Sequence, residues 1–260
     1  MASKKYAILT DIHGNLEALN KSLSIINQQK DVEKIIFLGD YFSLGPAPVE
    51  VFNILSNMPI ETVFIRGNHE RYLIEKIWTN PKPKIEGMNL NDPVLNGIVK
   101  HQKWVFDQIG AKLFEFIEKR TKISYNETIG SNHLEFSHAW FERDERAPSK
   151  HEARKLSDKY LNSNKNIKSI IFVHGHIHIE RNDKHKNFSI YCPTSTGLPF
   201  DKVVKGSIGY LEINDDISFK IERFDYDFQK TIDLLNDRKP PFYKNLVQTV
   251  KFAEIRNNQL

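Results

Sequence analysis

Aspartate, asparagine and histidine residues occur in five short, separate segments of this 260-residue sequence. Each segment lies at or just after a run of apolar residues that predicts a β-strand. The candidates are Asp11 and His13, Asp40, Asn68 and His69, His138, and His176 and His178. Because the carboxyl ends of parallel strands open onto one edge of a sheet, we expect these side chains to meet in one place.

A cluster of imidazoles, carboxylates and one amide oxygen, without a thiolate, forms a borderline-hard set of metal ligands. It suits Mn, Fe or Zn, with Co and Ni as further candidates, better than Ca or Mg, which prefer shells of oxygen. Seven side chains are too many for one ion that must also hold a substrate. Two ions about 3.5–4 Å apart, bridged by a carboxylate, would use them all and could activate a water for in-line attack on phosphorus.

The order of these motifs resembles that of the calcineurin-like metallophosphoesterases. The motifs are Asp-x-His-Gly-Asn from Asp11, Gly-Asp at Asp40, Gly-Asn-His-Glu from Gly67, the lone His138, and Gly-His-x-His from Gly175. The likeness continues at Pro193–Pro199 and Phe224–Asp227, so it spans most of the chain. Gly39–Pro46 is similar to the small bacterial and archaeal branch that includes phosphodiesterases and diadenosine tetraphosphate hydrolases.

The resemblance implies a role for each motif residue. The residues implied to bind a first metal are Asp11, His13, Asp40 and His178. Those implied to bind a second metal, to which Asp40 would bridge, are Asn68, His138 and His176. His69 would assist the leaving group as a general acid rather than bind metal. The expected enzyme hydrolyses phosphodiester or dinucleoside polyphosphate bonds by in-line attack of a metal-bridging hydroxide.

Two other functions remain open, a phosphoprotein phosphatase of the same fold and a scaffold protein without the chemistry. Degenerate relatives usually lose the leaving-group histidine or the bridging carboxylate, and both His69 and Asp40 are present. The segment Cys192–Gly197 departs from the Asn-Pro-Gly-Ser-x-Gly expected of this branch, which leaves the role of that loop open. Two arginines and one histidine are candidate substrate or pocket residues, namely Arg143, Arg146 and His174.

Hydrophobic periodicity predicts the elements that must position these residues. Tyr6–Thr10, Lys34–Leu38 and Thr62–Ile65 predict buried parallel strands, with amphipathic helices between them. Residues 71–131 break this rhythm, and we predict a mostly helical insertion that caps the site, with a loop around Pro81–Pro93. Beyond it the pattern predicts further strands, a helix around Lys150–Leu161, a hairpin around residues 214–216 and two C-terminal helices. Together with these elements, the resemblance implies a single α/β domain over residues 1–260, a two-sheet αββα sandwich of the metallophosphoesterase type with helices on both outer faces.

The composition excludes several classes of protein. Apolar residues make up 40% and charged residues 27% of the chain, which is typical of globular proteins. Its apolar runs are much shorter than the roughly 20 residues that span a bilayer. A net charge of +4 with scattered lysines does not indicate nucleic-acid binding, so we expect a small phosphoester or nucleotide as substrate. The single cysteine and the absence of a secretory leader favour the cytoplasm, while the oligomeric state is not predicted.

Overall fold

The computed structural model describes residues 4–59, 61–214 and 217–257, and its strands form two mixed sheets. The first sheet has the order β11 (Ile217–Phe224), β10 (Gly206–Ile213), β1 (Lys4–Leu9), β2 (Val32–Phe37), β3 (Val63–Ile65) and β4 (Thr121–Lys122). The second has the order β5 (Ser124–Ile129), β6 (Asn132–Ser137), β7 (Ser169–Val173), β9 (Phe188–Pro193) and β8 (Glu180–Lys184). β1 to β4 are parallel to one another, as are β6, β7 and β9, so each sheet has an edge where several carboxyl ends meet.

The central strands are buried on both faces, as their unbroken apolar runs predict. In β1, Tyr6 and Ile8 point into the core between the two sheets, where they meet residues such as Phe136 of the second sheet. Ala7 and Leu9 point the other way, into the core beneath the helices. Alternate residues of one strand therefore serve two cores, which fixes the register of the sheet.

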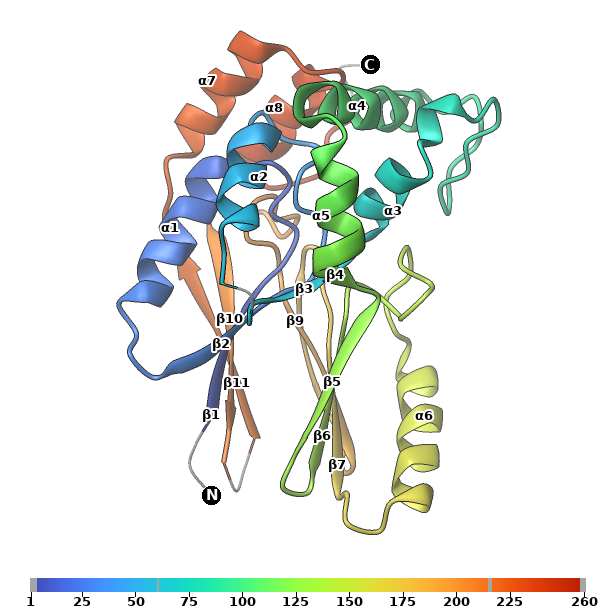
Figure 1. The fold of residues 1–260 in the computed structure, drawn as a ribbon, viewed down its shortest axis with the longest axis vertical. Helices are drawn as coiled ribbons and strands as arrows, with labels where there is room; N and C mark the ends of the chain where they lie inside the picture. Colours follow the sequence, from blue (N-terminus) through green and yellow to red (C-terminus); the bar gives the residue numbers. More distant parts are fainter. Residues whose placement is uncertain (1–3, 60, 215–216, 258–260) are drawn as a thin grey trace.

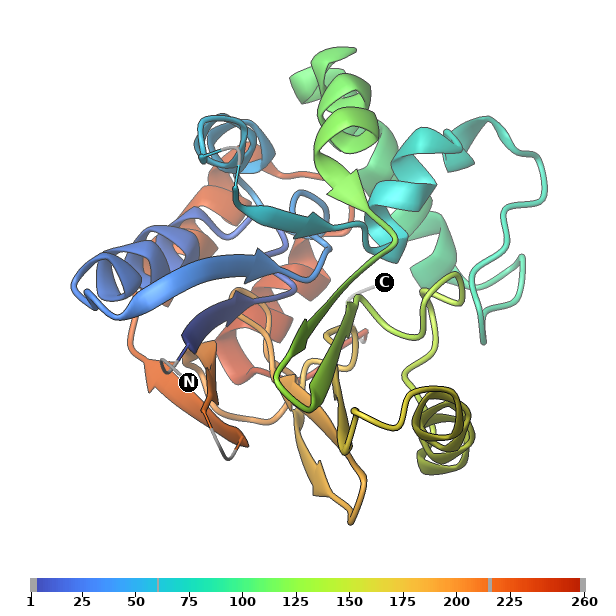
Figure 2. The ribbon, with the colours of Figure 1, turned by 60° about the horizontal axis from the view of Figure 1, so that its bottom comes forward.

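Helices cover the outer faces of the sandwich. α1 (Leu16–Asn27) and α2 (Pro48–Ser56) cover the first sheet, and α6 (Lys150–Ser163) covers the second. Figure 2 shows α1 (blue) and α6 (dark yellow) on opposite sides of the pair of sheets. The predicted αββα sandwich is confirmed.

The insertion after β3 is helical, but it is shorter than predicted. It contains α3 (Asn68–Ile74), a 3₁₀ turn at Ile77–Thr79, the predicted loop, α4 (Pro93–Ile109) and α5 (Lys112–Arg120). The predicted end at residue 131 is wrong for the helical part, because β4 and β5 follow α5 directly. β4 is the edge strand of the first sheet, and β5 is the edge strand of the second. Both are edge strands whose short, polar sequences lack an apolar period, as does the unpredicted β8.

The two predicted C-terminal helices are α7 (Phe228–Arg238) and α8 (Tyr243–Phe252), which pack on each other. Part of the predicted hairpin turn, residues 215–216, lies outside the described residues, while the strands on both sides of it pair as expected. α8 lies at the same end of the molecule as α4 (Figure 1). Gly97 of α4 is close enough to the ring of Phe242 that an added Cβ would lie 2.6 Å from it. None of the described helices is long and apolar enough to cross a bilayer.

Candidate metal centre

Most of the predicted metal ligands have an uncommon backbone conformation. Five of the seven, all located in loops after strands, have positive φ angles between 50° and 68°, namely Asp11, His13, Asp40, His176 and His178. Side chains other than glycine seldom adopt this left-handed conformation, and where they do the surrounding packing must enforce it. Such positions cluster at functional sites, so the backbone by itself marks this edge of the sandwich.

Two glycines let the loops of the centre approach one another closely. Gly39 has a φ of 95°, which favours glycine. Gly67 has an ordinary negative φ, but an added Cβ would lie 2.1 Å from the Oδ1 atom of Asp40. The first glycine is therefore required by its conformation and the second by a close approach.

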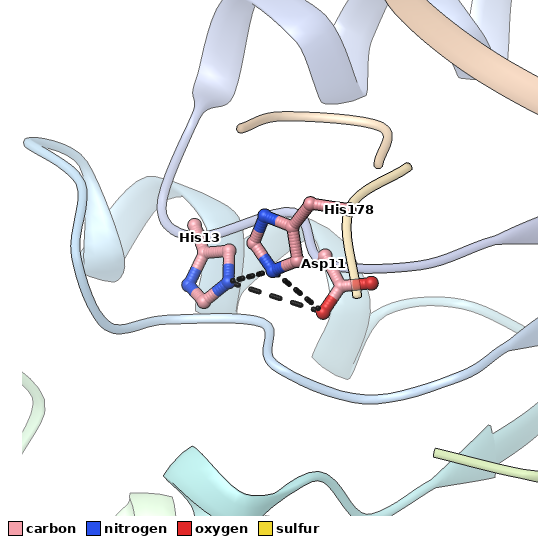
Figure 3. A group of neighbouring side chains, drawn as sticks. All are labelled: Asp11, His13 and His178. Atoms are coloured by element: carbon pink, nitrogen blue, oxygen red, sulfur yellow. Dashed lines mark hydrogen bonds and ion pairs between the residues drawn. The ribbon is translucent and has the colours of Figure 1, made fainter. Parts of the chain in front are cut away.

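Asp11, His13 and His178 form one group of side chains (Figure 3). The two Nε2 atoms of His13 and His178 are 3.2 Å apart, and the Nε2 of His178 is 3.2 Å from Oδ1 of Asp11. The Nε2 of His13 lies 3.9 Å from the same oxygen. Three potential ligand atoms from the first and second sheets thus converge on one point.

Asp40, Asn68, His138 and His176 form a second group next to the first. The Nε2 of His138 lies 3.3 Å from Oδ2 of Asp40 and 2.9 Å from the amide oxygen of Asn68. The Nδ1 of His176 lies 3.2 Å from that amide oxygen. Oδ2 of Asp40 is also 3.8 Å from Nε2 of His13 in the first group, so Asp40 lies between the two groups, where a bridging ligand would be.

Each carboxylate has one oxygen held by the protein and one that faces the histidines. Oδ2 of Asp11 accepts hydrogen bonds from the hydroxyl of Thr10 and the backbone N–H of His176. Oδ1 of Asp11 is buried and accepts no hydrogen bond from the described residues. In Asp40, Oδ1 accepts the backbone N–H of His69 at 3.0 Å, while Oδ2 faces His13 and His138. The oxygens left over are the ones that a cation would contact.

The histidines are oriented in the same way. The Nδ1 atoms of His13, His138 and His178 each face a backbone carbonyl, those of Ser43, Leu38 and Leu198 respectively. A carbonyl can only accept, so each Nδ1 carries a proton, and in the neutral form of each ring the Nε2 has a free lone pair. A ring nitrogen bonded to a carbonyl is the usual support of a histidine that binds metal through its other nitrogen.

The orientation of the rings shows whether the residues present suit a metal ion. In their neutral forms, His13 and His178 present two lone pairs to each other across 3.2 Å, and neither can donate. A cation shared by the two nitrogens and the free oxygen of Asp11 would satisfy all three atoms. The donor set therefore fits a metal site, and the second group repeats the pattern through Asp40 and His138.

The electrostatics of the centre favour a cation. Burial opposes ionisation of Asp40, but His138 and His69 outweigh it and hold the pKa of Asp40 well below its usual value. Burial also works against a charged His138, yet Asp40 raises the pKa of His138 to about 10. Burial lowers the pKa of His13 to about 4. A metal ion would take the place of the proton on His138, since a ligating imidazole must be neutral.

Glu70 fixes the loops that carry the second group. It is fully buried, and its carboxylate accepts the backbone N–H groups of Asp40, Tyr41 and Gly67 at 2.8–3.0 Å. Burial, followed by the nearby Asp40 charge, raises the pKa of Glu70 to about 7. Its role is to hold the backbone of two loops in register. The sequence analysis included it in the Gly-Asn-His-Glu motif without assigning it a role.

His69 lies between the metal groups and the inserted helix α4. Its Nδ1 is 2.5 Å from the side-chain amide nitrogen of Gln102, and Gln102 accepts a hydrogen bond from the hydroxyl of Ser43. Burial lowers the pKa of His69 to about 3, so the ring is neutral. One of its nitrogens lies within 4.8 Å of ligand atoms of His13 and Asp40. Gln102 was not predicted as a site residue, although a polar residue on the apolar face of a helix is a usable signal.

The loop whose role the sequence left open supports the first group. Ser195 donates its hydroxyl to the carbonyl of Asp11 at 2.8 Å, and the backbone N–H of Gly197 donates to the same carbonyl at 3.1 Å. Leu198 supplies the carbonyl that orients His178. The segment Cys192–Gly197 thus holds the Asp11 loop in place despite its altered sequence.

Three predicted residues lie away from the ligand atoms. Arg143 forms an ion pair with Glu152 at the start of α6 and, like Arg146, is exposed. Neither arginine lines the cavity at the metal ligands, and a contact with phosphate stays a prediction. His174 is buried, donates Nδ1–H to the carbonyl of Gly175, and belongs to neither ligand group.

A cavity of about 270 Å³ leads from the centre to the inserted and C-terminal segments. Its ligand end is formed by His13, Asp40, Asn68, His69, His176 and His178. Its apolar wall is formed by Leu44, Ile85, Met88, Val94, Ile98, Leu198, Phe200, Phe242, Leu246 and Ile255. The sequence analysis predicted a cap from residues 71–131 and missed the contribution of α8, because no local pattern reports where a terminal helix docks.

Comparisons with known proteins agree with this geometry. A sequence model of the family described as "Calcineurin-like phosphoesterase" matches residues 4–180, a range that contains all seven predicted ligands. An uncharacterized protein of Methanocaldococcus jannaschii, MJ0912, is 24% identical over 93% of this chain and 96% of its own length.

Two solved structures share the fold along nearly the whole chain. A hypothetical protein of Pyrococcus horikoshii, PH1004, has a TM-score of 0.76 at 17% identity and covers 97% of this chain and 99% of its own. A metallophosphoesterase from Sphaerobacter thermophilus has a TM-score of 0.67 at 19% identity, with coverage of 96% and 99%. The similarity therefore includes the C-terminal segments as well as the part that carries the ligands.

Proposed function

The chain belongs to the calcineurin-like phosphoesterase family of metal-dependent hydrolases, and from this premise we propose that it hydrolyses phosphodiester or dinucleoside polyphosphate bonds of small molecules. The observation that carries the proposal is the pair of facing Nε2 atoms of His13 and His178, 3.2 Å apart beside Oδ1 of Asp11, which accepts no hydrogen bond from the described residues. When both rings are neutral, their two lone pairs face each other, and a bound cation would satisfy both.

We propose that two transition-metal ions bind here, with Mn, Fe or Zn preferred on the donor set. Asp11, His13 and His178 would hold one ion, Asn68, His138 and His176 the other, and Asp40 both. When bound, the ions supply acidification of water near neutral pH and neutralisation of charge on phosphate oxygens.

The chain's own residues would orient the ligands and manage the leaving group. Since Nδ1 of His69 is bonded to Gln102, Nε2 is the nitrogen left for the substrate. When the Gln102 amide N–H donates to Nδ1, the neutral ring carries its proton on Nε2 and can donate a hydrogen bond to the leaving oxygen, which stabilises the negative charge that develops there. Groups that assist a leaving oxygen typically contribute 10²- to 10⁴-fold.

A small-molecule substrate is favoured over a phosphoprotein by the shape of the cavity. The ligand end lies beneath α4, α8 and the loop that contains Ile85 and Met88, and the volume is about 270 Å³. Pockets that hold small ligands typically have about 300–1,000 Å³, whereas a phosphoprotein needs an open surface around the phosphate. A scaffold role is disfavoured because the ligand set and His69 are complete.

Elemental analysis of the purified protein, with a substrate panel, tests the proposal. We expect about two transition-metal ions per chain and hydrolysis of a generic aryl phosphodiester in Mn²⁺ that chelation abolishes. Diadenosine tetraphosphate and a phosphopeptide complete the panel, and preferred cleavage of the phosphopeptide would favour the phosphatase alternative. A protein that binds no metal and cleaves none of these compounds would contradict the proposal.

A further inference from the structure

The cavity that leads from the ligand end narrows the class of substrate, an inference that rests on the proposed function. We infer that the substrate carries a single phosphoryl group esterified to a compact apolar group, such as an aryl ring, and that substrates with additional phosphates are disfavoured. The phosphoryl group would lie at the ligand end and the apolar group against the apolar wall.

The wall is apolar over segments that are far apart in the sequence. Val94 and Ile98 come from α4, Leu246 from α8, and Leu198 from the loop that supports the metal ligands. Ile98, Leu198 and Leu246 are at most 8% exposed, so these side chains are fixed by packing. Pockets of this kind bind apolar groups through area removed from water.

The charges around the cavity are unsuited to further phosphates. None of the described residues that line it is a lysine or an arginine. Among the described lining residues beyond the ligand end, the charged ones are Glu86 and Glu145. Glu145 is paired with Arg71, whose guanidinium also binds Asp144 at 2.8 Å and therefore has no free face for an anion.

A polyphosphate would therefore bring uncompensated negative charge against apolar side chains and a carboxylate. Proteins that bind several phosphates normally supply arginine, lysine or clustered backbone N–H groups for them. Among the described residues that line the cavity, the proposed metal centre would supply the cationic charge, and it suffices for one phosphoryl group. Any further phosphate would remain unpaired, which is costly in a partly buried site.

One polar group in the cavity is available to the single phosphoryl group or its ester oxygen. Tyr72 is 1% exposed, its ring centroid is 5.4 Å from that of His69, and it lines the cavity. Its buried hydroxyl has no hydrogen-bond partner of standard geometry among the described residues, although Asn68 and Glu145 lie near it. A substrate oxygen at the ligand end would accept the hydrogen bond that Tyr72 lacks.

The first test compares substrates of the wild-type protein in Mn²⁺. Bis(4-nitrophenyl) phosphate and phenyl-substituted monophosphoryl esters are compared with diadenosine tetraphosphate and ATP, whose phosphate leaving groups are similarly activated. We expect kcat/KM for the aryl esters to exceed that for each of the others by at least about 10-fold. Equal or faster cleavage of the polyphosphates would overturn the inference while leaving the proposed function intact.

A second test measures binding without turnover. Calorimetric titration compares three ligands that share one phosphoryl group. Phenylphosphonate adds an apolar ring to it, methylphosphonate adds only a methyl group, and pyrophosphate adds a second phosphate. We expect phenylphosphonate to bind at least about 10-fold tighter than methylphosphonate. We expect the affinity of pyrophosphate to be no higher than that of methylphosphonate. Equal affinity of the two phosphonates would overturn the inference. Failure of all three to bind, together with no hydrolysis, would overturn the proposed function as well.

A variant tests the role of charge directly. Met88 lies in the loop of the wall and is only half-buried, so Met88→Lys places a cation in the cavity without opening a packed core. We expect it to narrow the ratio of aryl ester to polyphosphate cleavage by about 10-fold. Gln108→Lys adds the same charge on the exposed face of α4 and should leave the ratio unchanged. Equal ratios in the two variants would contradict the assignment of the wall.

Discussion

The ligand end and the apolar wall enclose the same cavity but are built in opposite ways. The ligand end consists of polar, mostly buried side chains that follow directly after strands, held by hydrogen bonds to backbone carbonyls, as in His13 and His178, or to other side chains, as in His69 and His176. The wall consists of apolar side chains from α4, α8 and several loops between the elements, held by packing. The sheets thus determine which reaction is possible, while the segments around them determine what the reacting group is attached to.

Gln102 connects the two regions. It belongs to α4, which contributes Val94 and Ile98 to the wall, and its side chain bonds to His69 at the ligand end. A shift of α4 would therefore reach the leaving-group residue as well as the wall. Variants at the ligand end and in α4 can therefore show whether a change in one region alters the other.

The largest effect is expected at Asp40, between the two metal groups. Asp40→Asn removes the charge that both groups share, so we expect loss of at least one metal ion per chain and a fall in turnover beyond about 1,000-fold. Elemental analysis and the diester assay measure the two quantities. Asp201→Asn, which removes a carboxylate paired with Arg223 away from the cavity, is the control. Retention of two ions in Asp40→Asn would exclude Asp40 as the bridge.

The next effect separates metal binding from leaving-group assistance. His69→Asn keeps the proposed ligands, so we expect metal content near that of the wild type with turnover reduced by about 100-fold or more. The deficit should shrink for substrates with very acidic leaving groups, which need no proton. The exposed His151→Asn serves as the control. Near-normal turnover would remove His69 from the mechanism, and loss of metal would make it a ligand.

A smaller effect tests the connection between the regions. Gln102→Leu leaves Nδ1 of His69 and the hydroxyl of Ser43 without their partner, and we expect kcat to fall about 10-fold with little change in metal content. If Gln102 acts through His69, the double variant with His69→Asn should be no slower than His69→Asn alone. Gln108→Leu, on the exposed face of the same helix, controls for added apolar surface. Additive losses would show that Gln102 acts independently.

The smallest effect is expected at Glu127, a carboxylate outside both regions, where a substitution should change stability and leave turnover unchanged. Despite partial burial, hydrogen bonds from Lys34 and Tyr125 lower the pKa of Glu127 to about 2. A depressed folded-state pKa stabilises the fold above the ordinary glutamate pKa of 4.5, and this stabilisation is lost as the pH falls towards 2.

Glu127→Gln should therefore lower the free energy of unfolding at pH 7 by about 1 kcal/mol, since the site is partly solvated. The difference from wild type should disappear near pH 2, as followed by urea denaturation, and turnover at pH 7 should be unchanged. The exposed Glu118→Gln is the control. A difference that grows at low pH would contradict the assigned direction of the pKa.

The ligand end could be predicted from the sequence because its information is local. Asp11, Asp40 and His138 each follow an apolar strand within a few residues, and parallel strands bring their carboxyl ends together. The parallel sheet followed from the same strands, whereas the αββα sandwich was implied by the family resemblance.

The wall could not be predicted, because its residues look like any other core positions in the sequence. Leu246 and Val94 become neighbours of the metal ligands only through the docking of α8 and α4, which no local period encodes. The edge strand β8 was missed for a related reason, since Glu180–Lys184 lacks apolar residues and is held by pairing with β9. Arg143, conversely, follows a motif residue closely in sequence but pairs with α6 instead.

The left-handed backbone of the five loop ligands has an evolutionary consequence. Each such residue costs the native state on the order of 1 kcal/mol, so the five together approach the lower end of the roughly 5–15 kcal/mol that stabilises a whole domain. Glycine at these places would relieve that strain and abolish ligation. In a lineage without selection for turnover, substitutions that replace these residues would therefore raise stability and abolish activity. Retention of the five residues thus exchanges stability of the fold for activity.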